Sequence, residues 1–334
     1  MYKLWYTVLM PRVDRKNPTR AASSESRYSL MEFSREFPDD DACLNYLWRT
    51  RYSEDGEHAE CAKCQTTRSF RRYATAQRRQ SWTCIACGHH LHPTAGTIFA
   101  GSATSLHLWF YAMFLMTSTR CGISAKQLER ELGVTYKCAW RIFHLIRNEL
   151  MVQTDEPMTG AVEMDETYVG GKPRQSDVAK WGTEANSTKR RQAAQRWSNE
   201  TKTTVFGMVE RGGSVAAHVV PRKPQAAIMG HISAVVDPKS IVYTDDARIY
   251  DRLPRAGWEH RTISHSAKVY VQGDVHTQTI EGFWSLVKRG IGGTHHAVSA
   301  KHLQGYLNEY AWRYNHRSDG RAQFESLLLR AARR

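Results

Sequence analysis

Three acidic side chains, far apart in the sequence, could together carry out metal-dependent chemistry. Asp165 lies in VEMDETYVGG, Asp245 in IVYTDDARIY and Glu281 in HTQTIEGFWSLVKR. Carboxylate oxygens are the ligands that Mg²⁺ prefers, and two metal ions about 4 Å apart can activate the attacking oxygen and stabilise the leaving oxygen when a phosphodiester is cleaved. Such a site needs no covalent nucleophile, and the sequence contains no evident Ser or Cys triad.

Each of these acids also has an ordinary explanation, because carboxylates at strand ends and on helix faces are usually solvated. Glu163, Glu166 and Asp246 are the neighbouring alternatives. Side chains alternate along a strand, so Glu163 and Asp165 share one face while Glu166 points to the other. Asp245 is preferred to Asp246 because it directly follows the apolar part of its strand. A shared site therefore requires elements that bring the three acids together.

The third acid shares a predicted helix with a basic residue. Lys288 lies seven positions after Glu281, which is close to two helical turns, so the two side chains point in the same direction. By themselves they could form a surface charge pair. They become part of a candidate site if Asp165 and Asp245 reach the same place.

The first two acids lie in predicted strands. From Ala161 onward, apolar and polar residues alternate, and Gly212-Gly213 predicts a hairpin turn. The predicted order is three strands, a helix, two strands, the helix of Glu281 and a last helix, over residues 161–171, 204–211, 215–222, 224–236, 240–247, 261–266, 276–289 and 302–317. This order indicates an α/β fold with a mixed sheet and helices on its faces, in which the strands of Asp165 and Asp245 can be neighbours.

Four of the seven cysteines form a metal-binding pattern. Cys61 and Cys64 make one C-x-x-C pair, Cys84 and Cys87 make another, and nineteen residues lie between the pairs. This spacing predicts a zinc ribbon in which four thiolates hold one tetrahedral Zn²⁺. A redox C-x-x-C is the alternative. An odd number of cysteines without an export signal fits a reducing compartment.

The segment between the two cysteine pairs is strongly basic. It contains five arginines and no acid, with Phe70, Tyr73 and Trp82 among them. Arginine and aromatic side chains suit contacts to phosphates and stacking on bases. A solvated hairpin is the alternative. The residues that we expect to contact DNA here are Arg71, Arg72, Arg78 and Arg79.

A helix, a turn and a second helix are predicted in GISAKQLERELGVTYKCAWRIFHLIRNEL. Ser124 can cap the first helix, Gly133 makes the turn and Thr135 begins the second helix. This spacing is typical of a helix-turn-helix that reads DNA, although helical hairpins also occur in other folds. We expect Lys137 and Arg141 of the second helix to contact DNA.

Composition favours a polyanionic partner. The formal net charge is +14, hydrophobic residues make up 41%, and no apolar run approaches the roughly 20 residues that cross a bilayer. We therefore expect a cytoplasmic, nucleoid-associated protein with no membrane segment. The 334 residues allow two or three domains. We predict a disordered leader over 1–26, a helix with the zinc ribbon over 27–100 and a helix-turn-helix region over 101–155. The catalytic domain follows over 160–320, with a basic loop inserted at 172–202.

These motifs resemble those of insertion-sequence transposases of the IS1595 family, of the ISXO2-like type. The segments that carry the resemblance are MDETYVGGK at 164–172, YTDDARIY at 243–250, HTQTIEGFWSLVKRGIGGTHH at 276–296 and the cysteine region at 61–99. Thirty-five residues lie between Asp245 and Glu281, a spacing that resembles many DDE enzymes.

The resemblance implies a DDE catalytic domain with an RNase H-like fold. It implies that Asp165, Asp245 and Glu281 bind Mg²⁺ or Mn²⁺. Lys288 would contact DNA near the active site, together with Arg289. Some members of the group carry Asn just ahead of this helix, and here that place holds Gln278, which could share or replace the third ligand.

The implied activity is DNA transposition. The protein would bind terminal inverted repeats, cleave a phosphodiester at each end to free a 3′-OH, and join that end to target DNA by transesterification, as at least a homodimer. The alternative is a sequence-specific DNA-binding protein whose nuclease domain is inactive. The presence of all three acids and Lys288 argues against such decay.

Overall fold

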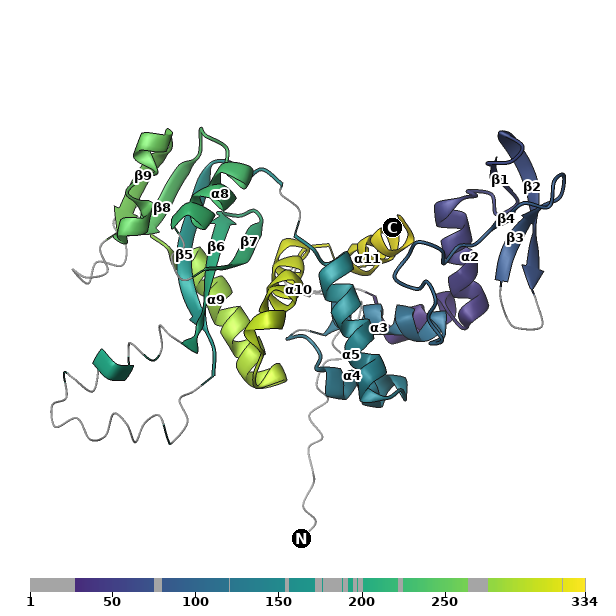
Figure 1. The fold of residues 1–334 in the computed structure, drawn as a ribbon, viewed down its shortest axis with the longest axis horizontal. Coiled ribbons are helices and arrows are strands. Elements are labelled where there is room, and N and C mark those ends of the chain that lie inside the picture. Colours follow the sequence, from purple (N-terminus) through teal and green to yellow (C-terminus); the bar gives the residue numbers. More distant parts are fainter. Residues whose placement is uncertain are drawn as a thin grey trace, which may run out of the picture.

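A small sheet, a group of helices and a larger sheet follow one another along the molecule (Figure 1). The computed structural model describes residues 28–74, 80–119, 121–153, 156–171, 201–221, 225–263, 276–319 and 321–333, with 176, 188, 192–194 and 197. The expected leader over 1–26, Arg78, Arg79 and all but scattered residues of the loop 172–202 lie outside this description. No helix among the described residues is long and apolar enough to cross a membrane.

The cysteine region forms the small sheet. Its strands β1 (His58–Cys61), β2 (Thr66–Ala74), β3 (Gln80–Cys84) and β4 (His90–Leu91) pair antiparallel in that order. Helix α2 (Asp40–Arg51) begins in a run of three aspartates, and the Asp39 side chain caps it by accepting from Ala42 N at 2.8 Å. Trp48 of α2 stacks on Trp82 of β3 at 4.7 Å between ring centroids, so α2 closes the apolar face of the ribbon.

The helical part has its own core and contains the predicted helix-turn-helix. Its helices are α1 (Leu30–Glu36), α3 (Leu106–Ser118), α4 (Ala125–Leu132), α5 (Tyr136–Leu145), the π-helix η1 (Ile146–Leu150) and α11 (Ala322–Arg333). Ser124 and Thr135 cap α4 and α5, and Gly133 has a left-handed φ of 63°. These three predictions are confirmed, because capping and turn geometry depend on local sequence.

The prediction that 302–317 is the last helix was wrong. Helix α11 follows it and packs back on α2 and α3, far from α11 in the sequence. The signal was present, since Phe324, Leu327, Leu328 and Ala331 follow the i, i+3, i+4, i+7 spacing of a buried helical stripe. The helical core therefore contains side chains from both ends of the described chain, from α1 and from α11.

The larger sheet is the predicted mixed sheet. Strands β5 (Ala161–Val169), β6 (Thr203–Glu210), β7 (Val215–Val220), β8 (Ile241–Asp245) and β9 (Glu259–Ile263) stand in the order β7-β6-β5-β8-β9. The pairs among β5, β6 and β7 are antiparallel, and those of β8 with β5 and β9 are parallel. Helix α8 (Gln225–Val235) and the 3₁₀ turns η2 (Arg248–Tyr250) and η3 (Pro254–Ala256) lie by one face.

The other face of this sheet is covered by α9 (Gln278–Gly290) and α10 (Leu303–Asn315). The π-helix η4 (Ile291–His295) continues α9, and the 3₁₀ turn η5 (Ala300–His302) leads into α10. Apolar residues of α9, such as Phe283 and Val287, pack with Val205 and Val209 of β6. The helix that carries Glu281 is thus laid directly on the sheet.

A buried ion pair joins the helix-turn-helix to α10. Arg147 Nε of η1 donates to Glu309 Oε2 of α10 at 2.7 Å, and these side chains are 2% and 0% exposed. Arg313 Nη2 donates to the other oxygen of Glu309 at 2.9 Å, and the guanidinium of Arg147 lies between the rings of Phe143 and Tyr306. Because buried charges are costly unless they are paired, this cluster keeps the two parts in contact.

Gly207 of β6 leaves room for α9 against the sheet. It pairs with Asp165 of β5, and a Cβ at this position would come within 2.4 Å of Trp284 Cζ2 and 3.0 Å of Ile280 Cδ1. Both of these side chains belong to α9. A glycine here therefore lets α9 approach the strand that carries the first acid.

Gly207→Ala should lower the free energy of unfolding by about 1–3 kcal/mol, the typical cost of overpacking a core. Urea denaturation measures this. The matched control is Gly230→Ala in α8, where nothing lies within 4 Å of the added Cβ. That change should raise stability by up to about 1 kcal/mol because alanine favours a helix. Equal stability of the two variants would contradict the close approach of α9.

Candidate active site

The register of β5 and β8 brings the first two acids to the same level. Ala161, Val162 and Glu163 pair in parallel with residues 241, 242 and 243. Continuing the same offset places Asp165 level with Asp245. Since side chains at the same level of neighbouring parallel strands point to the same face, the two carboxylates are directed to one side of the sheet. Both are half-buried.

Helix α9 brings Glu281 to that same side. Trp284 Nε1 donates to Asp165 Oδ2 at 3.1 Å, so one turn of α9 touches the first acid directly. Glu281 lies in the first turn of the helix, is exposed, and its Oε1 accepts from Thr277 Oγ1 at 3.2 Å. Gln278, the alternative ligand, is the first residue of α9 and is also exposed.

Glu163 fixes the start of α9 on the sheet. Its side chain is fully buried, and its carboxylate accepts from Thr279 N at 2.8 Å and from Ile280 N at 3.1 Å. These amides belong to the first turn of the helix, where a negative charge is favoured by the helix dipole. Arg211 Nε donates to the same carboxylate at 2.7 Å. Glu163, a competing candidate in the sequence, is thus an anchor for the helix that carries Glu281.

The acids interact through their charges. Burial, with smaller contributions from the nearby carboxylates of Asp245 and Glu281, raises the pKa of Asp165 to about 6. They are not gathered at one point, because the only group of at least three His, Cys, Asp or Glu side chains with all ligand atoms within 4.8 Å, among the described residues, is the four cysteines. The arrangement stores repulsion that a cation placed between the carboxylates would relieve.

Sequence reasoning placed Glu166 on the other face of its strand but did not identify its partner. Glu166 points to the opposite face from Asp165, as the alternation predicted, and accepts from Tyr250 Oη at 2.6 Å. Burial, together with the charges of Asp165 and Asp245, raises the pKa of Glu166 to about 7 against the opposing effect of the Tyr250 hydrogen bond. Nothing local in DETYV or DDARIY identifies this pair, because 84 residues separate them.

The basic residues of α9 lie at its other end. Lys288 and Arg289 are exposed in the last turn, and Lys288 is on the same side of the helix as Glu281. Lys137 and Arg141 are exposed on α5. In the ribbon, Arg71 is exposed, whereas Arg72 Nη2 binds Asp41 Oδ1 of α2 at 2.5 Å. The contacts of these six side chains with DNA stay predictions, as do those of Arg78 and Arg79, which lie outside the described residues.

The four cysteines come together as the spacing predicted. Their sulfur atoms lie within 4.8 Å of one another, and Cys61 Sγ is 3.5 Å from Cys87 Sγ. Ligands from two separate turns converge on one point, so the cluster could hold one metal ion. The nearby His90 is not part of this cluster, and its Nδ1 is hydrogen-bonded to Ser81 and Thr83.

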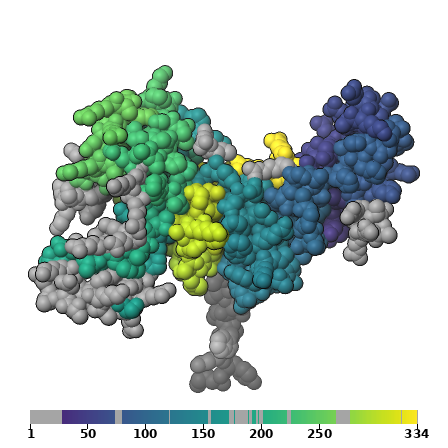
Figure 2. Space-filling view, viewed as in Figure 1, coloured from purple at the N-terminus to yellow at the C-terminus, as the bar shows by residue number. Residues whose placement is uncertain are grey.

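A polar cleft of roughly 720 Å³ lies between the helix-turn-helix and the segment that continues α9. Figure 2 shows this yellow-green segment at the surface between the green sheet and the teal helices. The cleft is lined by residues of α4, α5, η4 and α10, among them Lys126, Arg130, Tyr136, Trp140 and His296. Cationic and aromatic side chains therefore line the space between the two parts.

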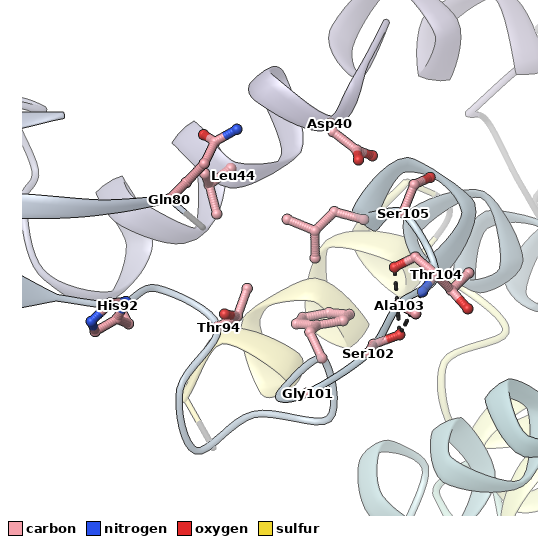
Figure 3. Close-up of a pocket in the computed structure, with 12 residues that line it drawn as sticks. Asp40, Leu44, Gln80, His92, Thr94, Gly101, Ser102, Ala103, Thr104 and Ser105 are labelled. Atoms are coloured by element: carbon pink, nitrogen blue, oxygen red, sulfur yellow. Dashed lines mark hydrogen bonds between the residues drawn. The ribbon is translucent and has the colours of Figure 1, made fainter. Parts of the chain in front are cut away.

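A second cavity, of roughly 650 Å³, separates the ribbon from the helical core (Figure 3). Asp40 of α2 and Gln80 of β3 line it together with Ser102 and Thr104 of the loop before α3. Asp40 Oδ1 accepts from His107 N at 2.8 Å, which ties α2 to α3 beside this cavity. The ribbon stands at the opposite end of the molecule from the sheet that carries Asp165 and Asp245 (Figure 1), so this cavity is not part of the candidate active site.

Comparison with known proteins matches residues 157–315 to the ISXO2-like transposase domain, a span that contains all three acids and Lys288. A protein in transposable element ISH50 of Halobacterium salinarum is 31% identical over 279 residues, which is 80% of this chain and 90% of that protein. This chain belongs to the ISXO2-like transposase family. A transposase-like protein of Haemophilus influenzae is 34% identical over 97 residues, covering 29% of this chain and 77% of that protein.

Among solved structures, the chain is similar to one in the intasome of simian T-cell lymphotropic virus bound to a PP2A regulatory subunit. The sequence identity is 13%, and the match covers 55% of this chain and 63% of the other. At a TM-score of 0.26 this similarity is too low to indicate a shared fold. Membership of the ISXO2-like transposase family therefore rests on the sequence matches, and it confirms the resemblance inferred from the motifs.

Asp165→Asn in this transposase should stabilise the metal-free protein at neutral pH. The folded-state pKa of Asp165, about 6, lies above its unfolded value near 4, so the folded state binds more protons between these values and stability falls as pH rises through them. An asparagine does not titrate, so the variant does not lose stability in this way as the pH rises. Its advantage in unfolding free energy should be small at pH 4 and reach about 1–3 kcal/mol at pH 7.

Urea denaturation of both proteins at each pH, with a chelator of divalent cations that leaves the cysteine site intact, measures the difference. Comparing the two at one pH cancels the groups that titrate in both. An advantage that does not change between pH 4 and pH 7 would contradict the raised pKa of Asp165.

Proposed function

We propose that this protein is a DNA transposase of the DDE type that cleaves and joins DNA at the ends of an insertion sequence. The observation that carries the proposal is that three carboxylates face the same side of the sheet and interact through their charges. Asp165 and Asp245 stand level on adjacent parallel strands, and Glu281 enters on a helix anchored two residues from Asp165. An accidental set of surface acids has no reason to share such an anchor.

The sheet topology supports an RNase H-like catalytic domain. Three consecutive antiparallel strands are followed by two parallel strands on the other side of β5, and helices pack on both faces. The acids of the proposed site come from the central strand, its parallel neighbour and a covering helix. The fold assignment remains part of this proposal.

The donor set fits a pair of divalent cations. Three hard oxygen donors from separate elements suit Mg²⁺ or Mn²⁺, and cations would offset the charges of Asp245 and Glu281 that add to burial in raising the pKa of Asp165. When bound, the metal ions would activate the attacking oxygen and stabilise the leaving oxygen. Asp165, Asp245 and Glu281 would hold them, and the Trp284 N–H orients the carboxylate of Asp165.

The reaction would proceed in two displacements at phosphorus. In the first, water attacks a phosphodiester at the end of the element, the bond to the 3′ oxygen breaks, and a 3′-OH is freed. In the second, that 3′-OH attacks a phosphodiester of the target, so one bond forms as another breaks and no external energy source is needed. Lys288, exposed on the face of Glu281, would contact the DNA phosphates.

The DNA would extend from the active site toward the helix-turn-helix. The cleft between α5 and η4 carries Lys126 and Arg130, and α5 presents Lys137 and Arg141 beside it. The net charge of +14 supports a polyanionic partner. The helix-turn-helix and the ribbon would bind the terminal inverted repeats, and two ends would require at least a dimer. A protein of this kind would act on the bacterial nucleoid.

The four cysteines would hold a structural Zn²⁺. The purified protein should contain one zinc per chain, and Cys84→Ser should lose it, because a tetrahedral site with three thiolates binds far more weakly. Elemental analysis counts the zinc, and tryptophan fluorescence reports the stacked Trp48 and Trp82 of the ribbon core. The exposed Cys121→Ser is the control and should keep both signals. A zinc-free, fully folded wild-type protein would contradict this assignment.

Asp165→Asn and Asp245→Asn should bind DNA that carries the element ends but fail to nick or join it in Mg²⁺, a loss of at least about a hundredfold. Neutral isosteres remove the metal ligands and keep the shape. Asp246→Asn, which removes the neighbouring exposed carboxylate, should cut at a rate within several-fold of wild type. A gel assay that reads binding and cleavage on the same labelled DNA measures all four proteins.

Binding without cutting by the wild-type protein, in both Mg²⁺ and Mn²⁺, would instead support a DNA-binding protein with an inactive nuclease domain. Equal cleavage by Asp165→Asn and wild type would place the active site elsewhere. Nicked products without joined products would restrict the activity to an endonuclease.

A further inference from the structure

The pairing of β5 with β8 ends just before the two acids. Their ladder ends at the pair Glu163 and Tyr243. Beyond it, Asp165 remains paired with β6 through Gly207, and Asp245 remains paired with β9 through Ile263. The backbone at each acid is thus paired with a strand on its outer side only. The hydrogen bonds between β5 and β8 end before this level, so they do not set the distance between Asp165 and Asp245.

The hydrogen bond from Tyr250 Oη to Glu166 Oε1 crosses this fork at 2.6 Å. Glu166 is the residue next to Asp165 on β5. Tyr250 ends the 3₁₀ turn η2, which follows Asp245 after two residues. Asp245 Oδ1 in turn accepts from Ala247 N at 3.1 Å, so the turn and the acid are tied together. The bond therefore links the two branches of the fork immediately beyond the acids.

The tyrosine is rigidly held at its own end. Its side chain is 1% exposed and packs in the apolar cluster that contains Val242, Leu253 and Trp258. A side chain packed on all sides has one rotamer available, so the position of the hydroxyl is set by the core and not by Glu166. The hydrogen bond draws β5 to a fixed point on the β8 side.

We propose that the Tyr250–Glu166 hydrogen bond, here called the fork clasp, sets the spacing between Asp165 and Asp245 and thereby the affinity of the site for divalent cations. Tyr250 and Glu166 act as positioning residues and leave the ligation to the other acids. The inference rests on the proposed function, since it assigns the metal site to Asp165 and Asp245. Outer groups that orient metal ligands are commonly worth 10–100-fold in metal affinity.

The test uses zinc-loaded, full-length protein and Mn²⁺ as the probe. Binding is followed by the electron paramagnetic resonance signal of free Mn²⁺, without DNA, at pH 7.5. Tyr250→Phe removes only the hydroxyl and should raise the dissociation constant about tenfold, the lower end of that range. Glu166→Gln keeps a carbonyl oxygen that accepts the same bond, so its dissociation constant should stay within about threefold of wild type.

The matched control is Tyr28→Phe. Tyr28 Oη donates to Glu36 Oε2 at 2.7 Å in the helical core, which is the same chemistry in a different part of the molecule. This variant should bind Mn²⁺ as wild type does. In the cleavage assay, Tyr250→Phe should need about tenfold more Mg²⁺ for half-maximal rate and should approach the wild-type rate at saturating Mg²⁺, whereas a general loss of structure would lower the maximal rate.

Mn²⁺ binding by Asp165→Asn distinguishes failure of the fork clasp from failure of the proposed metal site. Loss of Mn²⁺ binding in Asp165→Asn with unchanged binding in Tyr250→Phe would overturn the fork clasp alone. Weaker binding by Glu166→Gln than by Tyr250→Phe would make Glu166 a ligand and also overturn it. Unchanged binding in Asp165→Asn would overturn the metal site, and the fork clasp with it.

Discussion

The buried carboxylate of Glu163 is the contact on which the geometry of the candidate site depends. A fully buried charge is tolerated because Arg211 and two amides at the start of α9 compensate it. It lies two residues from Asp165 on the same face of β5, so one strand holds both the first acid and the anchor of the helix that brings the third. Gly207 completes the arrangement by giving the indole of Trp284 room to reach Asp165.

The same helix connects the acids to the helix-turn-helix. Helix α9 continues into η4, which lines the polar cleft opposite α4 and α5. Arg147 and Glu309 form a buried pair between η1 and α10. A buried pair resists sliding, because a displaced partner would leave an uncompensated charge. The surface that presents Lys137 and Arg141 is therefore held in a defined relation to α9.

The parts predicted well are those whose cause is local. The cysteine pairs, the capped helices of the helix-turn-helix and the order of strands and helices along the catalytic part of the chain follow from spacing and capping over a few residues. The roles of Glu163 and Tyr250 could not be predicted in this way. Their partners lie 116 and 84 residues away, and no periodic pattern connects them. Helix α11 was missed although its apolar stripe is regular, because a stripe does not say what it will pack against.

By itself, the sequence determined the chemistry that is available: which acids stand on which face of their elements, four thiolates spaced for one metal, and a family membership carried by short motifs. The tertiary structure alone decided which groups meet. It placed Asp165 level with Asp245 through the strand register, gave Glu163 to the start of α9, and opened a fork that Tyr250 and Glu166 bridge. The reason is physical, since alternation and helical spacing fix directions along one element, whereas distances between elements follow from packing the whole chain.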